Sequence, residues 1–216
     1  MGINIERTVK EPFNMILQNP QILVPSVLPF VLTLITVLVV GGATLSPLAL
    51  VTLGVMAIIL FIITILSILV ASGATTYMAF LQSKGEMPSY MDGINAAMDR
   101  LGALLIASIV IGVVGAVGLI LFVIPGLIWL LLTAFTIPAI MIDRREAIDA
   151  IKYSIDIVKR NAGEVVVFLI ILGIISYVIS AVLSLIPIIG APLGALISSA
   201  YSAIALTLAY LQIRAK

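Results

Sequence analysis

The sequence predicts an all-α integral membrane protein with six transmembrane helices. We expect three parallel repeats, each an interfacial amphipathic helix followed by a transmembrane hairpin. Three observations predict this class: the composition, the lengths of the apolar runs and the placement of the charges. Hydrophobic residues make up 62% of the 216 residues and charged residues only 10%, whereas a soluble domain is about half apolar and a quarter charged. We therefore predict a single membrane domain over residues 1–216.

Six apolar runs are candidates for the spans, since a crossing helix needs roughly 20 apolar residues. The runs are 22–40, 48–72, 101–124, 127–142, 165–186 and 192–213. The second continues without charge to Gln82 and would reach about 52 Å at 1.5 Å per residue. We expect it to extend beyond the bilayer or to break near Gly73. The fourth run is short, with 16 residues, and contains Pro138.

The charges predict the orientation. All 11 Lys and Arg residues and all 10 Asp and Glu residues lie outside three short connections, at 41–48, 124–127 and 186–192. Lys and Arg near the ends of spans are retained in the cytoplasm. We therefore expect a multi-pass protein of the cell membrane with both termini cytoplasmic. The charges among residues 1–18 also argue against a cleavable signal peptide.

Three charged segments have the pattern of amphipathic helices. Segment 145–160 places its apolar residues on one face and its charged residues on the other. Those apolar residues are Ile148, Ile151, Ile155 and Val158. Arg145 and Asp149, one turn apart, are expected to pair. Segments 3–18 and 88–100 show related patterns, and all three helices are expected to lie at the membrane interface.

An internal repeat accounts for this arrangement. Aligning Asn19, Arg100 and Asn161 superposes the three amphipathic segments, and a proline of the outer turn follows 25 to 28 residues later. The prolines are Pro47, Pro125 and Pro187, and the repeats are 1–82, 83–143 and 144–216. Two crossings per unit return the chain to one face, so the repeats are parallel. Asn19 is expected to cap the first span, with Pro20 in its first turn.

Two stretches carry a family resemblance. The sequences AIDAIKYS at 147–154, VKRN at 158–161 and FVIPGLIW at 122–129 resemble those of uncharacterised prokaryotic and archaeal six-span membrane proteins. That group is related to the membrane domain of glycerophosphoryl diester phosphodiesterases. The resemblance implies six spans with interfacial helices. It implies no catalytic residue, because the phosphodiesterase activity belongs to a soluble barrel that this chain does not match.

The composition argues against an enzyme, a metalloprotein and a nucleic-acid-binding protein. There is no Cys and no His, and the net charge is +1, so thiolates, imidazole bases and a basic surface for phosphates are missing. We expect no catalytic, cofactor or metal site. The ionisable residue nearest a span core is Glu164, in the first turn of the fifth span. The span serines should bond to carbonyls of their own helix or across helices; they include Ser176, Ser180, Ser184 and Ser199.

Two ladders of small residues predict close helix packing, since lipid supplies no hydrophobic force between spans. They consist of Gly112, Gly115 and Gly118 in the third span and of Ala191, Ala195, Ser199 and Ala203 in the sixth. They pack spans within one chain or between copies of a homo-oligomer. The sequence leaves both arrangements open.

A set of hydroxyl-bearing and aromatic residues forms a candidate ligand groove for an uncharged or lipid molecule. Its members are Thr75, Thr76, Tyr77, Trp129, Thr133, Thr136, Tyr201, Ser202 and Tyr210. The simpler interpretation is that Tyr and Trp gather at membrane interfaces.

Two functions remain in view. The sequence favours a non-catalytic scaffold, assembly or membrane-organising factor whose cytoplasmic interfacial helices face lipid head groups or a membrane-protein partner. The alternative is a transporter or pore for small uncharged or lipid-like molecules. The family resemblance alone suggests a third, an accessory subunit of lipid metabolism.

Overall fold

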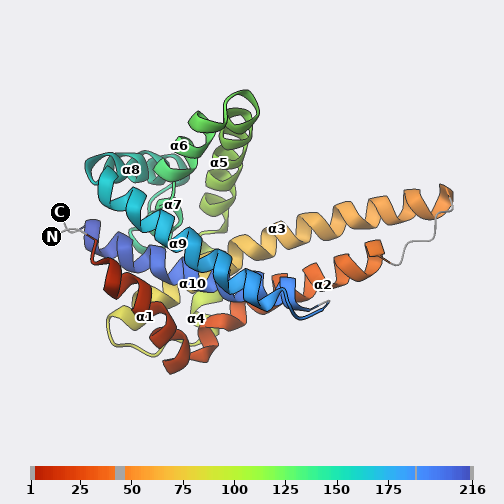
Figure 1. The fold of residues 1–216 in the computed structure, drawn as a ribbon, viewed down its shortest axis with the longest axis horizontal. Coiled ribbons are helices and arrows are strands. Elements are labelled where there is room, and N and C mark those ends of the chain that lie inside the picture. Colours follow the sequence, from red (N-terminus) through yellow and green to blue (C-terminus); the bar gives the residue numbers. More distant parts are fainter. Residues whose placement is uncertain (1–2, 42–46, 188, 215–216) are drawn as a thin grey trace.

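The computed structural model describes residues 3–41, 47–187 and 189–214, with side chains for all of these except 37–41 and 47–53. The regular structure in these ranges is entirely helical (Figure 1). Its elements are α1 (Ile5–Gln18), the 3-10 helix η1 (Pro20–Ser26), α2 (Val27–Gly41), α3 (Pro47–Ser83), α4 (Tyr90–Asp99), α5 (Leu101–Leu121), α6 (Val123–Leu132), α7 (Thr136–Ile142), α8 (Ala147–Arg160), α9 (Ala162–Leu183) and α10 (Gly190–Ile213).

Within the residues that the structure describes, five stretches of helix are long and apolar enough to cross a membrane. They are Gly54–Ser83, Leu101–Leu121, Val123–Ile142, Ala162–Leu183 and Gly190–Ile213. A sixth is added if α1 and Pro20–Thr36, which meet at 93°, are counted as one bent span. The predicted all-helical class, with several helices long and apolar enough to cross a membrane, is thus confirmed. The threefold repeat and the number of six spans stay predictions.

The spans associate as hairpins of consecutive helices. Helix α2 packs on α3, α5 on α6, and α9 on α10, and α10 also packs along α3. In Figure 1 the α2–α3 pair projects far beyond the other helices. Most of the predicted connection at 41–48 lies outside the described residues. Helix α3 is continuous over 37 residues, about 55 Å at 1.5 Å per residue, so it does not break near Gly73.

Gly73 instead allows other helices to approach α3. A Cβ at this position would lie 3.0 Å from Leu104 Cδ1, 3.2 Å from Ala97 Cβ and 3.3 Å from Met141 Sδ. These neighbours belong to α5, α4 and α7. The glycine therefore marks a crowded crossing rather than a flexible point.

The fourth span begins earlier than predicted and is broken. Helix α6 starts at Val123, so the predicted connection at 124–127 lies inside it, and the chain turns at Phe122. Pro125 is tolerated there because the first N–H groups of a helix have no partner within it. The helix ends at Leu132 and resumes as α7 at Thr136.

Ser154 of α8 bridges this break. Its hydroxyl accepts a hydrogen bond from the Phe135 N–H (3.1 Å) and donates one to the Leu132 carbonyl (2.8 Å). Ser154 is fully buried. Two backbone groups freed by the break are thus satisfied without water.

Asn19 does not cap the first span, so that prediction is wrong. Its amide nitrogen donates to the carbonyl of Pro88 (3.0 Å), in the segment between α3 and α4. Asn19 occupies the N-cap position of η1, but its side chain forms no capping hydrogen bond there. Pro20 does occupy the first turn of η1, as predicted.

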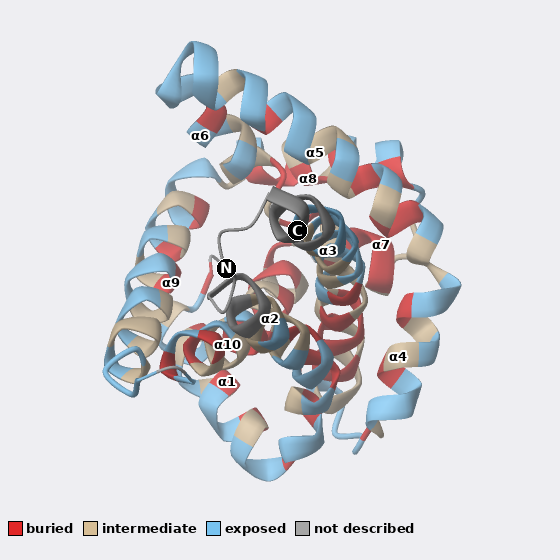
Figure 2. Cartoon of the chain, turned by 90° about the vertical axis from the view of Figure 1, so that its right-hand side faces the viewer, coloured by how far each residue is buried: buried red, intermediate tan, exposed pale blue. Residues whose placement is uncertain are grey.

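The core lies where α3, α5, α7, α8 and α10 meet, and its large buried members include Leu104, Phe135, Ile140 and Tyr210. Half of the most apolar window of Gly190–Ile213 is buried, against 17% for Leu101–Leu121 and for Ala162–Leu183, and 11% for Gly54–Ser83. Figure 2 shows this difference in burial: α7 and α10 are largely buried, whereas α5, α6 and α9 are largely exposed. Most spans therefore leave their apolar surface available to lipid.

Two of the three predicted glycines of α5 pack against α6. A Cβ on Gly115 would lie 3.3 Å from Leu130 Cδ2, and one on Gly118 would lie 2.9 Å from the Cα of Gly126. A Cβ on Gly126 would lie 2.6 Å from the backbone nitrogen of Leu119. Gly112 has nothing within 4 Å of such a Cβ. This ladder closes a hairpin within one chain, and Gly126 is a partner that the sequence analysis missed.

We predict that Gly126→Ala destabilises the protein by about 1–3 kcal/mol, because the new methyl group meets backbone rather than a flexible side chain. The matched control is Gly112→Ala, which places the same methyl group in open space on α5 and should be neutral or stabilising. Chemical denaturation in detergent micelles measures both. Equal free energies of unfolding for the two variants would contradict the tight crossing.

Candidate functional site

The nine residues of the candidate ligand groove lie on four helices and do not form one site. Thr75, Thr76 and Tyr77 lie on α3, and three others lie on α10. The remaining three lie on α6, α7 and the break between them: Trp129, Thr133 and Thr136. Several of them are structural anchors, while Thr75 lines an apolar groove and Tyr77 lines a polar hollow.

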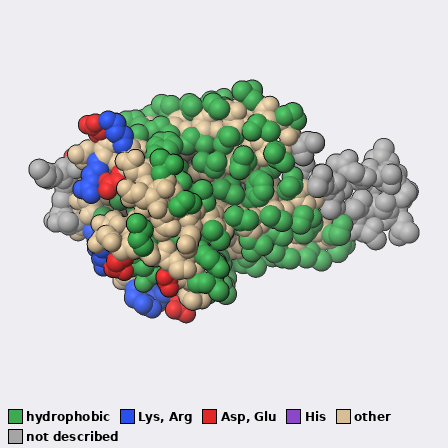
Figure 3. All heavy atoms as spheres, turned by 90° about the horizontal axis from the view of Figure 1, so that it is seen from below, with side chains coloured by type: hydrophobic (Ala, Val, Ile, Leu, Met, Phe, Trp, Pro, Cys, Tyr) green, Lys and Arg blue, Asp and Glu red, His purple; other side chains and the backbone are tan. Residues whose placement is uncertain are grey.

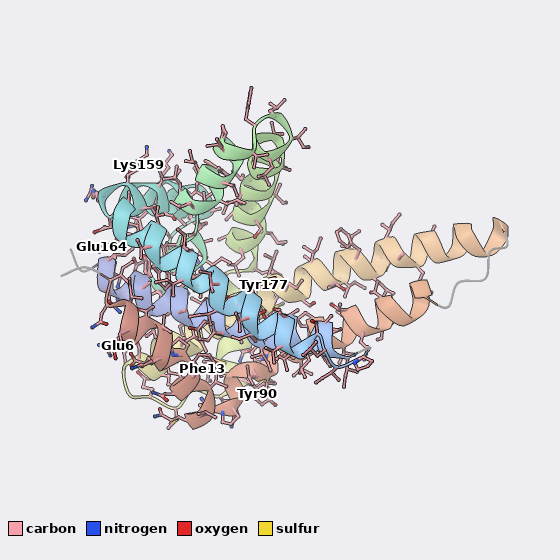
Figure 4. All side chains as sticks on the ribbon, in the orientation of Figure 1. Glu6, Phe13, Tyr90, Lys159, Glu164 and Tyr177 are labelled. Atoms are coloured by element: carbon pink, nitrogen blue, oxygen red, sulfur yellow. The ribbon has the colours of Figure 1, made fainter. Side chains whose placement is uncertain are left out.

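Tyr201 anchors α1 to α10. Its hydroxyl donates to the Val9 carbonyl at 3.0 Å, and its ring lies 4.7 Å from that of Phe13 (centroid to centroid). Figure 4 labels Phe13 on the same helix. Tyr201 is fully buried, so it serves the docking of α1 rather than an open groove.

The beginning of α1 is held by the ends of two spans. The Ile3 N–H donates to Glu164 Oε2 at 2.9 Å, and Glu164 lies in the first turn of α9, as predicted. The Asn4 N–H donates to Gln212 Oε1 at 2.6 Å, while Gln212 Nε2 donates to Thr8 Oγ1 at 3.2 Å. Helix α1 is thus tied by side chains to α9 and α10.

Tyr210 joins the end of α10 to the segment after α7. Its buried hydroxyl donates to Asp143, and Arg214 pairs with the same carboxylate. The ring of Tyr210 lies 6.4 Å from that of Tyr153 in an edge-on arrangement. The guanidinium of Arg145 stacks 3.8 Å above Tyr153. This network fixes α7, α8 and α10 to one another.

Arg100 holds the turn between α7 and α8. Its Nη2 donates to the carbonyl oxygens of Arg144 (2.7 Å) and Arg145 (2.6 Å), and it lies 3.3 Å from a Glu146 carboxylate oxygen. Arg144 has a φ of 53°, in the left-handed region that non-glycine residues seldom adopt. The sequence analysis used Arg100 only to align the predicted repeats. It missed the role of Arg100 in this turn, because nothing in the neighbouring sequence indicates its distant carbonyl partners.

Ion pairs one turn apart line the exposed faces of α1 and α8. Lys10 lies 2.7 Å from Glu6. Arg145 lies 2.8 Å from Asp149, and this second pair was predicted from the sequence. The hydrogen bond from Lys10, and its charge, lower the pKa of Glu6. Burial opposes the charged form of Arg145, but the hydrogen bond to Asp149 and its charge outweigh it, so its pKa is raised. Exposed pairs of this kind contribute little to stability.

Most span hydroxyls are paired, which confirms the interpretation of the serines. Ser176 and Ser202 form a hydrogen bond of 2.9 Å between α9 and α10, and Ser180 donates to Ser198 at 3.2 Å. Ser184 and Ser199 donate to carbonyls within three residues. The buried Thr133 and Thr136 do likewise, and Trp129 Nε1 donates to the Ile111 carbonyl at 3.1 Å, joining α6 to α5.

Thr75 lines an apolar groove of about 140 Å³ between α2, α3 and α10. Three members of the α10 ladder, Ala195, Ser199 and Ala203, line the same groove, while Ala191 does not. Thr75 is 1% exposed, and its Oγ1 has no hydrogen-bond partner in the part of the chain that the structure describes. One residue of the predicted ligand groove, Thr75, thus lies beside three residues of the small-residue ladder that was predicted to pack helices.

A second, polar hollow lies at the charged end. It measures about 450 Å³ and is lined by residues that include Tyr77, Asp92, Asp99, Arg100 and Arg144. Asp92 is engaged in capping its own helix, where it accepts from the Ser89 N–H at 2.9 Å. The described residues include no group of three or more acidic side chains that could hold a metal ion.

Comparisons with known proteins find no match among family models, curated proteins or solved structures. They link the chain to no family.

We predict that Tyr210→Phe lowers the free energy of unfolding by about 1.5–3 kcal/mol, the usual contribution of a hydrogen bond to a charged group. Tyr177→Phe is the matched control, because this tyrosine of α9 is 74% exposed and should change stability by less than about 0.5 kcal/mol. Denaturation of both variants in the same detergent compares them. Similar losses would show that the contact with Asp143 is not a stabilising one.

Proposed function

We propose that this protein is a non-catalytic scaffold, assembly or membrane-organising factor that presents α1, α4 and α8 at the cytoplasmic surface of the cell membrane. The observation that carries the proposal is a contrast in packing. Side chains of α9 and α10 bond to the backbone of α1 and of the two residues before it, and the Ser154 side chain of α8 bonds to the backbone of the fourth span. Most spans, by contrast, bury little of their surface against one another.

The geometry of α1 supports a position at the interface. It meets the following apolar segment at 93°, so α1 lies along the membrane surface if that segment crosses it. In the face that Figure 3 displays, charged side chains gather at one end of the molecule and hydrophobic side chains cover much of the remaining described surface. A helix with one charged and one apolar face is stable in such an interface.

Helix α8 offers the most charged face to a partner. Lys152, Asp156, Lys159 and Arg160 are exposed, and Figure 4 shows Lys159 at the outside of the molecule. Such a face suits anionic lipid head groups or an acidic segment of a membrane-protein partner. Because Ser154 and Ile151 hold the opposite face in the core, α8 is presented in a fixed position.

A transporter or pore for small uncharged or lipid-like molecules is the alternative. The groove at Thr75 supports binding of such a molecule. Against a path between α9 and α10, the serines that would line it are hydrogen-bonded to one another across the two helices. We therefore favour the scaffold.

The proposal is tested by isolating the protein from native membranes after mild crosslinking and by adding it to liposomes containing anionic lipid. We expect a partner in fixed ratio, or a change in liposome shape, that is lost in the Lys152→Glu, Lys159→Glu double variant because the reversed charges repel an anionic surface. Lys84→Glu, in the segment after α3, is the control. If the unaltered protein captures no partner and leaves liposome shape unchanged, the proposal is contradicted.

The orientation has its own test, which the absence of Cys in the chain simplifies. We predict that a membrane-impermeant maleimide labels Ser184→Cys in intact cells but labels Lys84→Cys only after the cells are opened. Both positions are exposed. Labelling of Lys84→Cys in intact cells would overturn the cytoplasmic placement of the charges.

A further inference from the structure

The size of the groove between α2, α3 and α10 limits what it can hold. Its volume is about 140 Å³, and an apolar cavity of about 150 Å³ accepts a molecule the size of benzene. A transmembrane helix is about 10 Å across with its side chains and cannot enter. A stretch of about six carbons from a hydrocarbon chain fits.

The lining indicates an uncharged ligand that can accept a hydrogen bond from Thr75. Within the described part of the chain the lining residues are apolar, small or hydroxyl-bearing, without a charged side chain. The hydroxyls of Thr33 and Ser199 already donate to the carbonyls of Pro29 and Leu196. Among the described residues the Thr75 hydroxyl is buried without a partner, and a buried hydroxyl without a partner costs about 1–3 kcal/mol.

The depth of Thr75 indicates which part of a lipid it would meet. It precedes the end of α3, at Ser83, by eight residues, or about 12 Å along the helix. The polar layer on each side of a bilayer is about 7 Å thick. If the end of α3 lies at the outer edge of that layer, Thr75 lies just inside the hydrocarbon, close to the ester oxygens of a glycerolipid.

The groove has an entrance for a lipid chain. Ala195 and Ser199, on the α10 side, are exposed, while Ser26 and Pro29 on the opposite side are buried. Because the exposed residues are small, a chain can enter sideways from the bilayer. Larger side chains at these two positions would close the opening.

We propose that this groove binds one hydrocarbon chain of a neutral glycerolipid, with an ester or hydroxyl oxygen of the lipid accepting a hydrogen bond from Thr75. The site explains why the α10 ladder is small without being tightly packed and why Thr75 lacks a protein partner. It is separate from the charged surface helices and does not depend on their having a partner.

The test uses the full chain reconstituted in phosphatidylcholine vesicles with a dioleoylglycerol that carries a diazirine in one acyl chain. After illumination, peptide mapping should place most of the label on residues lining the groove. Ala195→Leu should reduce this labelling at least fivefold, because the leucine blocks the entrance. Ala191→Leu, one turn away on the same ladder and outside the groove, should leave it unchanged.

The hydrogen bond is tested separately. Thr75→Val keeps the shape of the side chain and should weaken retention of the labelled lipid about fivefold or more, from the value of one hydrogen bond. Thr207→Val is the control, since that buried threonine of α10 donates to the Ala203 carbonyl (2.8 Å). Circular dichroism establishes whether each variant is folded. If Thr75→Val does not fold, the Ala195→Leu variant tests whether the groove binds the lipid.

Two results would overturn the proposal. One is label spread evenly over the exposed faces of α5 and α9, which would indicate ordinary solvation by bulk lipid. The other is equal labelling of the Ala195→Leu and Ala191→Leu variants. Retention unaffected by Thr75→Val would overturn the assigned hydrogen bond.

Discussion

Hydrocarbon offers no partner to a backbone N–H or carbonyl, and the rest of this structure depends on that constraint. It accounts for the unbroken length of α3 and for the short, single turn at Phe122 between α5 and α6. Where the chain departs from a regular helix, side chains replace the missing bonds. Ser154 does so between α6 and α7, and Arg100 binds two carbonyls of the turn before α8.

Close contact and open surface are distributed along the spans according to residue size. Gly118 and Gly126 bring α5 and α6 together, and a Cβ on Gly194 would lie 3.0 Å from the Cα of Ser180, so α10 meets α9 there. On another face of α10, equally small residues border empty volume. Small residues thus allow two helices to pack closely but do not require it. Whether a close contact or a groove forms depends on the residues of the facing helix.

The sequence predicts much of the secondary structure because charge and apolar periodicity act locally. Segments 3–18, 88–100 and 145–160 correspond to α1, α4 and α8 within two residues at either end. Distant partners leave no such signal. The amide of Asn19 reaches Pro88 instead of capping its own helix. Pro138 indicates an interruption of the fourth span, but nothing near Thr133 indicates that a serine of α8 bonds to the freed backbone groups. The candidate ligand residues were selected by side-chain type, and only Thr75 among them borders the groove, since Tyr201 and Tyr210 are occupied by α1 and Asp143.

The hydroxyl of Ser154 has a mechanical consequence. If α8 moved away from the other helices, the Phe135 N–H and the Leu132 carbonyl would lose their hydrogen-bond partner in an apolar environment. The position of α8 and the break in the fourth span therefore depend on each other through these two hydrogen bonds. A force applied to α8 is thus transmitted to the break between α6 and α7.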